Sequence, residues 1–280
     1  MANATLKKKR NGFRPNKRLG QHFLKDRGII DEIIDRAGFH SSDRILEIGA
    51  GLGALTLPLA ASGHQISAVE KDGRLTAMLD ESLTREGIRN VTLINEDILK
   101  LDFDELLPHP GEKIHVIGNL PYNISSPLLE KLIKHRHRIA RAVLMFQFEL
   151  ARRLIASPGN KAYGAMTVLI GYHTSVSPLL EVPKGAFYPK PKVGSMVLEL
   201  DFERPYPRRA DNEVHFKKVV RGAFAHRRKT ILNSFKGALF SCGIDELLKA
   251  FEKCEIDPKT RAETLSIDDF LCLSAALGCL

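Results

Sequence analysis

Residues 45–53 read Ile-Leu-Glu-Ile-Gly-Ala-Gly-Leu-Gly, a short β-rich run followed by three glycines at alternate positions. A pattern with helical apolar spacing begins directly after them. Glycines suit a tight turn that a ligand must approach closely, because a Cβ atom would block that approach. We therefore predict a strand, a glycine-rich turn that borders a ligand, and a helix.

The next predicted strand ends in Glu70, which lies 21 residues after Gly49. An acidic side chain at this position can accept hydrogen bonds from both hydroxyls of a ribose. The glycine-rich turn and Glu70 together indicate a cofactor that contains an adenine nucleoside. They leave its identity open, because Gly49, Gly51 and Ala54 also fit the GxGxxA pattern of dinucleotide-binding proteins.

Short β-rich runs alternate with helical patterns through the first 200 residues. This alternation is typical of a doubly wound α/β fold, in which helices cover a parallel sheet and ligands bind at the carboxyl ends of the strands. The predicted strands are Ile45–Ile48, Ile66–Val69, Val91–Ile94, Ile114–Ile117, Ala142–Phe146, Met166–Tyr172 and Ser195–Leu200, and the predicted helices between them are Leu55–Ala61, Gly73–Thr84 and Pro127–His135.

The pattern changes at residues 203–212, which read ERPYPRRADN and contain two prolines without apolar periodicity. Such a composition is typical of a linker. The segments from Glu213 onward suit helices and contain no convincing strand. We therefore predict an α/β domain with a basic N-terminal extension over residues 1–203, and a small all-helical domain over residues 204–280.

The net charge of +9 is concentrated in two segments. Residues 1–27 contain nine basic residues and one acid, and residues 217–236 contain seven basic residues and no acid. Basic blocks of this kind contact nucleic-acid phosphates, although the second block could also be the solvated side of a helix pair. We predict that its phenylalanines belong to a core and that RNA backbone contacts come from Arg221, Arg227, Arg228 and Lys229.

All four cysteines lie in the last forty residues, without a CxxC pair or a histidine at metal-ligand spacing. This spacing predicts neither a disulfide framework nor a zinc site, and it suits a reducing compartment. No apolar run is long enough for a membrane span, and no signal-peptide core follows the basic N-terminus. We expect a cytoplasmic protein without metal or membrane contact, with a mitochondrial transit peptide as the weaker alternative. Nothing in the sequence demands a dimer.

Two further predicted strand ends carry polar groups. Asp97 could accept a hydrogen bond from an adenine amino group, with a solvated loop acid as the alternative. Asn119-Leu120-Pro121-Tyr122 follows the next strand. The side-chain oxygen of Asn119 and a nearby backbone carbonyl could accept both hydrogens of an aromatic amine and so favour a pyramidal, reactive nitrogen. Tyr122 could stack on a base flipped out of its helix or loop; a proline-stabilised turn is the alternative.

Several of these motifs resemble, in their order along the chain, those of the ribosomal RNA adenine dimethyltransferase family. They are GQHFL (20–24), EIGAGLG (47–53), Glu70, Asp97, NLPYNISSPLL (119–129), FYPKPKV (187–193) and RRKT (227–230). The resemblance extends from about Lys17 to Phe270. The ending DPKTRAE (257–263) is more similar to the housekeeping KsgA branch of the family than to the antibiotic-resistance Erm branch.

The resemblance implies a Rossmann-like methyltransferase domain, S-adenosylmethionine as the methyl donor, and dimethylation of two adjacent adenosines in a loop near the 3′ end of small-subunit (16S) ribosomal RNA. It also implies a role in small-subunit biogenesis, on the 30S particle or its precursor. Carried over by motif, the donor would be held by His22, Leu24, Gly49, Gly51, Glu70, Asp97 and Asn119, and the target amine by Asn119, the Leu120 carbonyl, Tyr122 and Phe187.

Two departures from the family pattern lie at the donor pocket, because His22 stands where the family often has Asn and Ala50 where it often has Pro. Phe187 could equally belong to a stiff proline loop that only joins two strands. Other functions remain as alternatives: a large-subunit methyltransferase of the Erm type, or a ribosome-assembly RNA-binding factor with secondary methylation. A nicotinamide oxidoreductase would need a hydride-accepting site, for which we find no His or Tyr-Lys pair.

Overall fold

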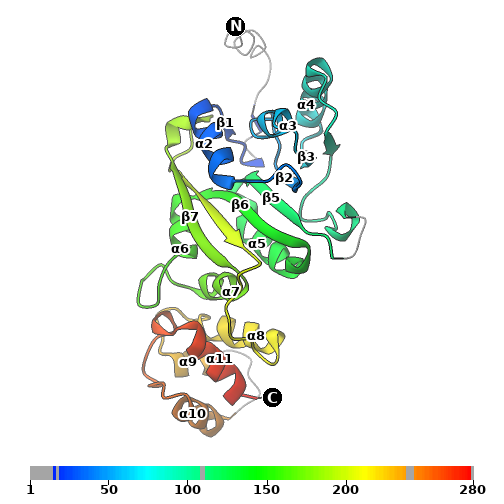
Figure 1. Cartoon of the computed structure of the whole chain (residues 1–280). Coiled ribbons are helices and arrows are strands. Elements are labelled where there is room, and N and C mark those ends of the chain that lie inside the picture. Colours follow the sequence, from blue (N-terminus) through cyan, green and yellow to red (C-terminus); the bar gives the residue numbers. More distant parts are fainter. Residues whose placement is uncertain (1–14, 17–18, 108–110, 238–242, 279–280) are drawn as a thin grey trace.

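Seven strands form the central sheet of the computed structural model, which describes the chain except residues 1–14, 17–18, 108–110, 238–242 and 279–280 (Figure 1). The strands are β2 (Arg44–Ile48), β3 (Gln65–Val69), β4 (Val91–Ile94), β5 (Ile114–Asn119), β6 (Ile139–Gln147), β7 (Ser175–Val182) and β9 (Ser195–Asp201). Their order in the sheet is β4-β3-β2-β5-β6-β9-β7. The five strands from β4 to β6 are parallel, whereas β9 runs antiparallel to both β6 and β7.

Helices cover both faces of this sheet. They are α2 (Arg27–Ala37), α3 (Thr56–Ala61), α4 (Gly73–Glu86), α5 (Ser125–Lys134), α6 (Phe148–Leu154) and α7 (Ala165–His173), with short 3-10 helices η2 (Asp104–Leu106), η3 (Tyr122–Ile124), η4 (Arg136–Arg138) and η5 (Lys184–Ala186). Neighbouring strand residues point to opposite faces, so Ile45 packs with α2, α3 and α4, whereas Leu46 packs in the core that contains α5 and α6. Among the described residues, no helix is both long and apolar enough to cross a membrane.

The strand predicted at Met166–Tyr172 is wrong, because these residues belong to helix α7. Six of the nine residues of α7 are buried: Ile170 packs in the sheet core, whereas Val168 and Tyr172 pack in a separate core with the C-terminal helices. A helix that is apolar all round shows no periodicity that separates it from a buried strand. The neighbouring edge strand β7 was missed, since its proline and exposed polar residues hide the strand pattern.

The C-terminal part is helical as predicted, and it contains α8 (Glu213–Ala223), α9 (Ile231–Gly237), α10 (Ile244–Lys253), η6 (Ala262–Thr264) and α11 (Ile267–Ala276). The predicted α/β class is also confirmed. Phe216 and Phe235 of the basic block are buried in the core of these helices. Because α7 contributes to both cores, it joins the two parts of the molecule (Figure 1). The predicted boundary between residues 203 and 204 stays a proposal.

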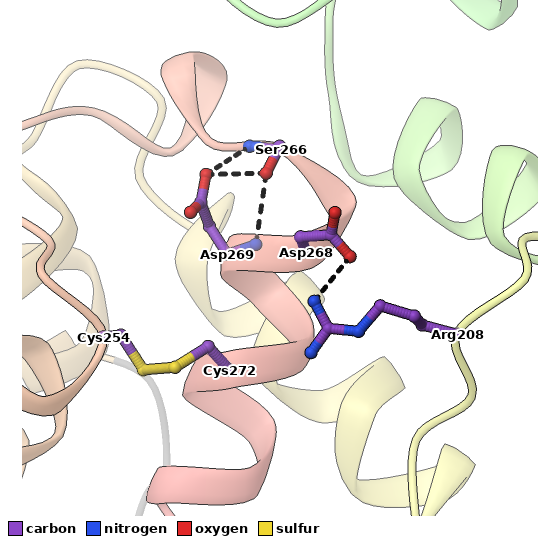
Figure 2. Close-up of a disulfide and its surroundings, with 6 residues drawn as sticks. All are labelled: Arg208, Cys254, Ser266, Asp268, Asp269 and Cys272. Carbon is purple, nitrogen blue, oxygen red and sulfur yellow. Dashed lines mark hydrogen bonds and ion pairs between the residues drawn. A yellow bond between two sulfur atoms is a disulfide. The ribbon is translucent and has the colours of Figure 1, made fainter.

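Cys254 and Cys272 form a disulfide, which corrects the prediction that the chain has no disulfide framework (Figure 2). Cys254 follows the last residue of α10, and Cys272 lies on α11. Their Cα atoms are 5.8 Å apart, within the range of a disulfide. The sequence spacing carries no signature of this pair, since the packing of α10 against α11 brings the two residues together. The inference of a reducing compartment from cysteine spacing therefore loses its support.

We expect reduction of this disulfide to destabilise the C-terminal helices. The bond closes a sequence separation of 18 residues, which corresponds to about 3 kcal/mol of lost chain entropy in the unfolded state. Thermal unfolding with and without dithiothreitol measures the effect. A Cys254→Ser variant should unfold at the temperature of the reduced wild type and should not respond to dithiothreitol. Equal unfolding temperatures for the oxidised and reduced wild type would contradict the expectation.

Candidate active site

The glycine-rich turn follows β2, at the point where the strand order reverses between β2 and β5. Gly49 and Gly51 have φ values of 76° and 57°, in the left-handed region that favours glycine. The Gly49 N–H donates to the Val69 carbonyl at 2.8 Å, and the Gly51 N–H donates to Glu70 Oε2 at 3.0 Å. The turn is thereby held against the end of β3, with the predicted ribose acceptor Glu70 beside it.

Glu70 is oriented by backbone groups on both sides. Its Oε2 accepts from Gly51, and its Oε1 accepts from the Asp72 N–H at 2.8 Å. Burial raises the pKa of Glu70, and these backbone hydrogen bonds oppose the shift. A carboxylate offers about four lone-pair sites, so both oxygens keep capacity for a further donor. The geometry suits the predicted contact with two hydroxyls.

Asp97 follows β4 and lies at the next strand end along the same edge of the sheet. Its Oδ2 accepts from Lys71 Nζ at 2.8 Å, and its Oδ1 accepts from the Leu99 N–H at 3.0 Å. The hydrogen bond from Lys71 lowers the pKa of Asp97, which keeps the carboxylate ionised. Lys71 was not predicted, although it directly follows Glu70 in the sequence.

Residues 20–24, here called the crossing segment, lie against both the glycine-rich turn and the NLPY motif. A Cβ atom on Gly51 would be 3.4 Å from the ring of Phe23, and one on Gly20 would be 3.4 Å from Asn123 Oδ1. Gln21 Nε2 donates to Asp72 Oδ2 at 3.0 Å. The crossing segment therefore covers the carboxyl ends of β2, β3 and β5. Gln21 and Asp72 were missed, although Gln21 stands within the GQHFL motif.

Asn119 is the last residue of β5 and contacts both the crossing segment and the glycine-rich turn. Its Nδ2 donates to the His22 carbonyl at 3.0 Å. A Cβ atom on Gly49 would lie 3.5 Å from the Asn119 carbonyl oxygen, so the two motifs are in close contact. Because the amide nitrogen is bound to the crossing segment, the amide is oriented with Oδ1 as its available acceptor.

Tyr122 is the first residue of η3, and both its hydroxyl and its ring make contacts that fix the side chain. Its hydroxyl shares a hydrogen bond of 3.0 Å with Ser195 Oγ, and its ring stacks on the ring of His22 with a centroid distance of 5.8 Å and an interplanar angle of 29°. Burial raises the pKa of Tyr122, so its phenol stays neutral. His22 in turn donates from Nδ1 to the Pro189 carbonyl at 2.7 Å. Ser195 was missed because a serine inside a strand gives no functional signal.

Phe187 lies beside the crossing segment in a small antiparallel sheet formed by β1 (Phe23–Leu24) and β8 (Phe187–Tyr188). Leu24 pairs with Phe187, and Phe23 pairs with Tyr188. The ring of Phe187 is 1% exposed and packs in the core under α2 and α3, whereas Tyr188 is 48% exposed. The pairing places FYPKPKV at the site as the motif order implies, but the contact of Phe187 with a target base stays a prediction.

Glu47 is a buried acid that was not predicted as a site residue. It lies on β2, two residues before Gly49, and is 2% exposed. Burial raises its pKa to about 8, with a smaller contribution from the nearby Glu70. Its Oε2 has no hydrogen-bond partner in the described part of the chain. Glu47 is therefore protonated at neutral pH, directly beneath the glycine-rich turn.

We expect Glu47 to make the protein less stable as the pH rises. Between the unfolded pKa of 4.5 and the folded pKa of about 8, the unfolded state loses this proton and the folded state keeps it. The free energy of unfolding therefore falls through this window, by on the order of 5 kcal/mol. Glu47→Gln should remove this fall in denaturant titrations at pH 5, 6.5 and 8. Glu105→Gln, a change at an exposed acid, serves as the control; parallel curves for Glu47→Gln and wild type would refute the assignment.

The basic residues predicted to contact RNA differ in their surroundings. Arg221 Nη2 lies 2.6 Å from Glu130 Oε1, and Lys217 Nζ lies 3.7 Å from Glu130 Oε2, so this part of α8 is paired with α5. Arg227, Arg228 and Lys229 are exposed in the turn between α8 and α9, and no ion pair is found for them among the described residues. The turn is thus the more accessible part of the predicted RNA contact.

One group with metal-binding side chains, Asp102, Asp104 and His135, lies away from these strand ends, around η2 and the end of α5. Burial lowers the pKa of His135, and the neighbouring Lys131 and Lys134 lower it further. Their positive charge disfavours a cation here. The absence of a metal site stays a prediction.

The family model described as "Ribosomal RNA adenine dimethylase" matches residues 12–277. The chain belongs to the ribosomal RNA adenine dimethylase family. The match covers the glycine-rich turn, the NLPY motif, the crossing segment and the C-terminal helices together. The predicted family is thereby confirmed, and with it the enzyme class of adenine dimethyltransferases.

Members of this family resemble the chain over nearly its full length. The "Ribosomal RNA small subunit methyltransferase A" of Desulforapulum autotrophicum is 47% identical over 269 residues, which cover 96% of this chain and 94% of the relative. The protein of the same name from Bacillus thuringiensis is 42% identical and covers 95% and 92%. A dimethyladenosine transferase structure from Plasmodium falciparum is 29% identical, with a TM-score of 0.72 and coverage of 90% and 95%. The structure of the 23S rRNA methyltransferase ErmE is 24% identical and shares the fold, with a TM-score of 0.69. The matched region covers 91% of this chain and 99% of the ErmE chain.

Proposed function

We propose that the protein transfers methyl groups from S-adenosylmethionine to the exocyclic amines of two adjacent adenosines near the 3′ end of small-subunit ribosomal RNA. The observation that carries the proposal is the oriented amide of Asn119, which joins the glycine-rich turn to the NLPY motif. Relatives named as small-subunit methyltransferases, at 42% and 47% identity over most of the chain, support this substrate rather than large-subunit RNA.

The strand ends fit S-adenosylmethionine. Gly49 and Gly51 form the left-handed turn at the end of β2, Glu70 suits the ribose, and Asp97 suits the adenine amino group. The crossing segment, with His22 and Leu24, covers the region where the methionine part would lie, next to Gly49 and Asn119. When bound, the donor supplies an electrophilic methyl group on a sulfonium. His22 and Ala50 stand where the family often has Asn and Pro, so donor affinity is the property that these two positions affect.

The target amine is a poor nucleophile because its lone pair is delocalised into the adenine ring. Asn119 Oδ1 would accept one hydrogen of that amine, and the Leu120 carbonyl would accept the other, which favours a pyramidal nitrogen. Nδ2 of Asn119 is already bound to the His22 carbonyl, so the oxygen needs no reorientation. After the first transfer, one remaining hydrogen still binds an acceptor, and the second transfer can follow.

Tyr122 would stack on the flipped-out adenine, with Phe187 packing from another side. The hydroxyl of Tyr122 is bound to Ser195 and its phenol stays neutral, so its role is to position the base rather than to accept a proton. Methyl transfer leaves a positively charged nitrogen on the adenine, and this nitrogen is acidic enough to lose its proton to water. Catalysis then rests on positioning and electrostatics.

The exposed cations of the α8–α9 turn, Arg227, Arg228 and Lys229, would contact the RNA backbone, with Arg221 joining them if RNA displaces Glu130. The substrate would be the 30S particle or its precursor, and the enzyme would act as a monomer in the cytoplasm during small-subunit biogenesis. Residues 1–203 would bind the donor, and the helical residues 204–280 would contribute to RNA contact.

The deciding experiment supplies labelled S-adenosylmethionine with unmethylated small subunits, large subunits or stripped ribosomal RNA, and identifies the products by mass spectrometry of nucleosides. We expect dimethyladenosine in small-subunit RNA alone. A large-subunit product would assign the Erm-type reaction instead. Donor binding without any transfer would leave an RNA-binding assembly factor as the better account.

A further inference from the structure

An exposed aromatic side chain, Tyr188, lies beside the candidate active site in residues 184–193, here called the proline loop. Tyr188 is 48% exposed, and Val193 in the same loop is 45% exposed. Aromatic side chains contribute most when they are buried, so an exposed tyrosine beside an active site indicates a surface that a ligand covers.

The position of Tyr188 is set by three contacts of its neighbours. The strand pairing of Phe23 with Tyr188 aligns β8 with the crossing segment. The next residue, Pro189, accepts the hydrogen bond from His22 Nδ1, and the His22 ring stacks on Tyr122. Successive strand residues point to opposite faces, so Phe187 points into the core and Tyr188 points outward. Tyr188 therefore lies on the exposed face of β8, directly before the residue that binds His22.

The charges of the proline loop are all positive. Lys184, Lys190 and Lys192 are exposed, and the loop contains no acid. Within the described part of the chain no ion pair is found for these three lysines. An exposed aromatic ring flanked by unpaired cations is the combination that binds single-stranded nucleic acid: the ring stacks on a base and the cations contact phosphates.

We propose that Tyr188 stacks on the nucleotide next to the target adenosine, while Lys190 and Lys192 contact the flanking phosphates. The proposal rests on the proposed function, because it assigns a place to the neighbour of the base held by Tyr122. A base that flips into the site leaves its neighbour without a stacking partner, and Tyr188 replaces that partner.

The test compares Tyr188→Ala, Tyr188→Phe and wild type for methylation of unmethylated 30S particles. Loss of one stacked base should raise the KM for particles about tenfold or more, with kcat changed less than KM and with donor affinity unchanged. Tyr188→Phe keeps the ring and should restore the wild-type KM. A KM within twofold of wild type for Tyr188→Ala, or no rescue by Tyr188→Phe, would overturn the proposal.

The lysines are tested by the salt dependence of binding. Lys190→Ala should reduce the slope of log affinity against log salt by about 1, as expected for one lost phosphate contact. Lys134→Ala removes an exposed lysine from the end of α5, outside the proline loop, and should leave the slope unchanged. Equal slopes for Lys190→Ala and wild type would contradict the phosphate contact.

A binding measurement separates this proposal from the proposed function. Direct affinity for 30S particles is measured for the same variants without a methyl donor. If wild type binds particles but transfers no methyl group, the proposed function fails while the affinities still decide the role of Tyr188. If wild type dimethylates small-subunit RNA and Tyr188→Ala matches it in affinity and KM, only the role of Tyr188 fails.

Discussion

Asn119→Ala should lower the rate of methyl transfer by about 10²-fold or more, while the protein still binds its RNA. The change removes the oriented acceptor Oδ1 and the hydrogen bond from Nδ2 to the His22 carbonyl. Removal of one preorganised polar group that stabilises a transition state typically lowers kcat about 10²- to 10³-fold. The rate is measured with labelled donor on 30S particles, and donor affinity by calorimetry.

The matched control for this variant is Asn123→Ala, which removes an exposed amide from the same motif. It should retain most of the wild-type rate. Asn119→Asp tests the orientation of the amide, because a carboxylate offers acceptors but cannot donate to the His22 carbonyl. We expect its rate to stay far below wild type. If Asn119→Ala lost RNA affinity and rate to the same extent, Asn119 would be a binding residue and its assigned role would be wrong.

Gly118→Ala should strongly destabilise the α/β part of the molecule, although it adds only one methyl group. Gly118 pairs with Ile48 across β2 and β5, and a Cβ atom on it would lie 2.6 Å from the Ile48 carbonyl oxygen. Backbone atoms cannot move aside as a flexible side chain does, so the two strands must separate. We expect a loss of about 3 kcal/mol. For a chain of 280 residues this lowers the unfolding temperature by roughly 5–10 °C.

Gly171→Ala provides the comparison. Gly171 lies in helix α7, and a Cβ atom on it would lie 3.4 Å from Ile267 Cδ1, an ordinary van der Waals distance. A helical Gly→Ala change should be neutral or should add up to about 1 kcal/mol. The two variants are compared by thermal unfolding. Since Gly118 directly precedes Asn119, the strand separation in Gly118→Ala should also lower the methylation rate at temperatures where the variant is folded. An unfolding temperature equal to wild type would show that β2 and β5 tolerate the methyl group.

The parallel strands could be predicted from sequence because each is a short apolar run bounded by turn residues. The prediction of Val91–Ile94 coincides with β4, and the others of this group differ from the structure by one to three residues at an end. Helix α7 could not be predicted in this way. Its burial between two cores removes the polar face that would reveal helical periodicity, and the sequence contains no signal for the second core that covers it.

The strand ends of the candidate site were predictable because glycine, acid and amide residues follow apolar runs directly. Glu70, Asp97 and Asn119 lie where these runs end. The contacts that orient them were not predictable. His22 reaches Asn119 and Pro189 across 97 and 167 positions of the chain, and Ser195 reaches Tyr122 across 73. Such distant pairs depend on the tertiary fold, and no local pattern encodes them.

The pairing of β1 with β8 has a consequence for synthesis on the ribosome. Leu24 emerges early in translation, but its partner Phe187 follows 163 residues later. Contacts of such long sequence separation form slowly and late, since the intervening chain must first be ordered. The strand pairing of the crossing segment with β8 therefore forms only after most of the α/β part has been translated and folded. A nascent chain shorter than about 190 residues can form the glycine-rich turn, but it lacks the completed cover over that turn.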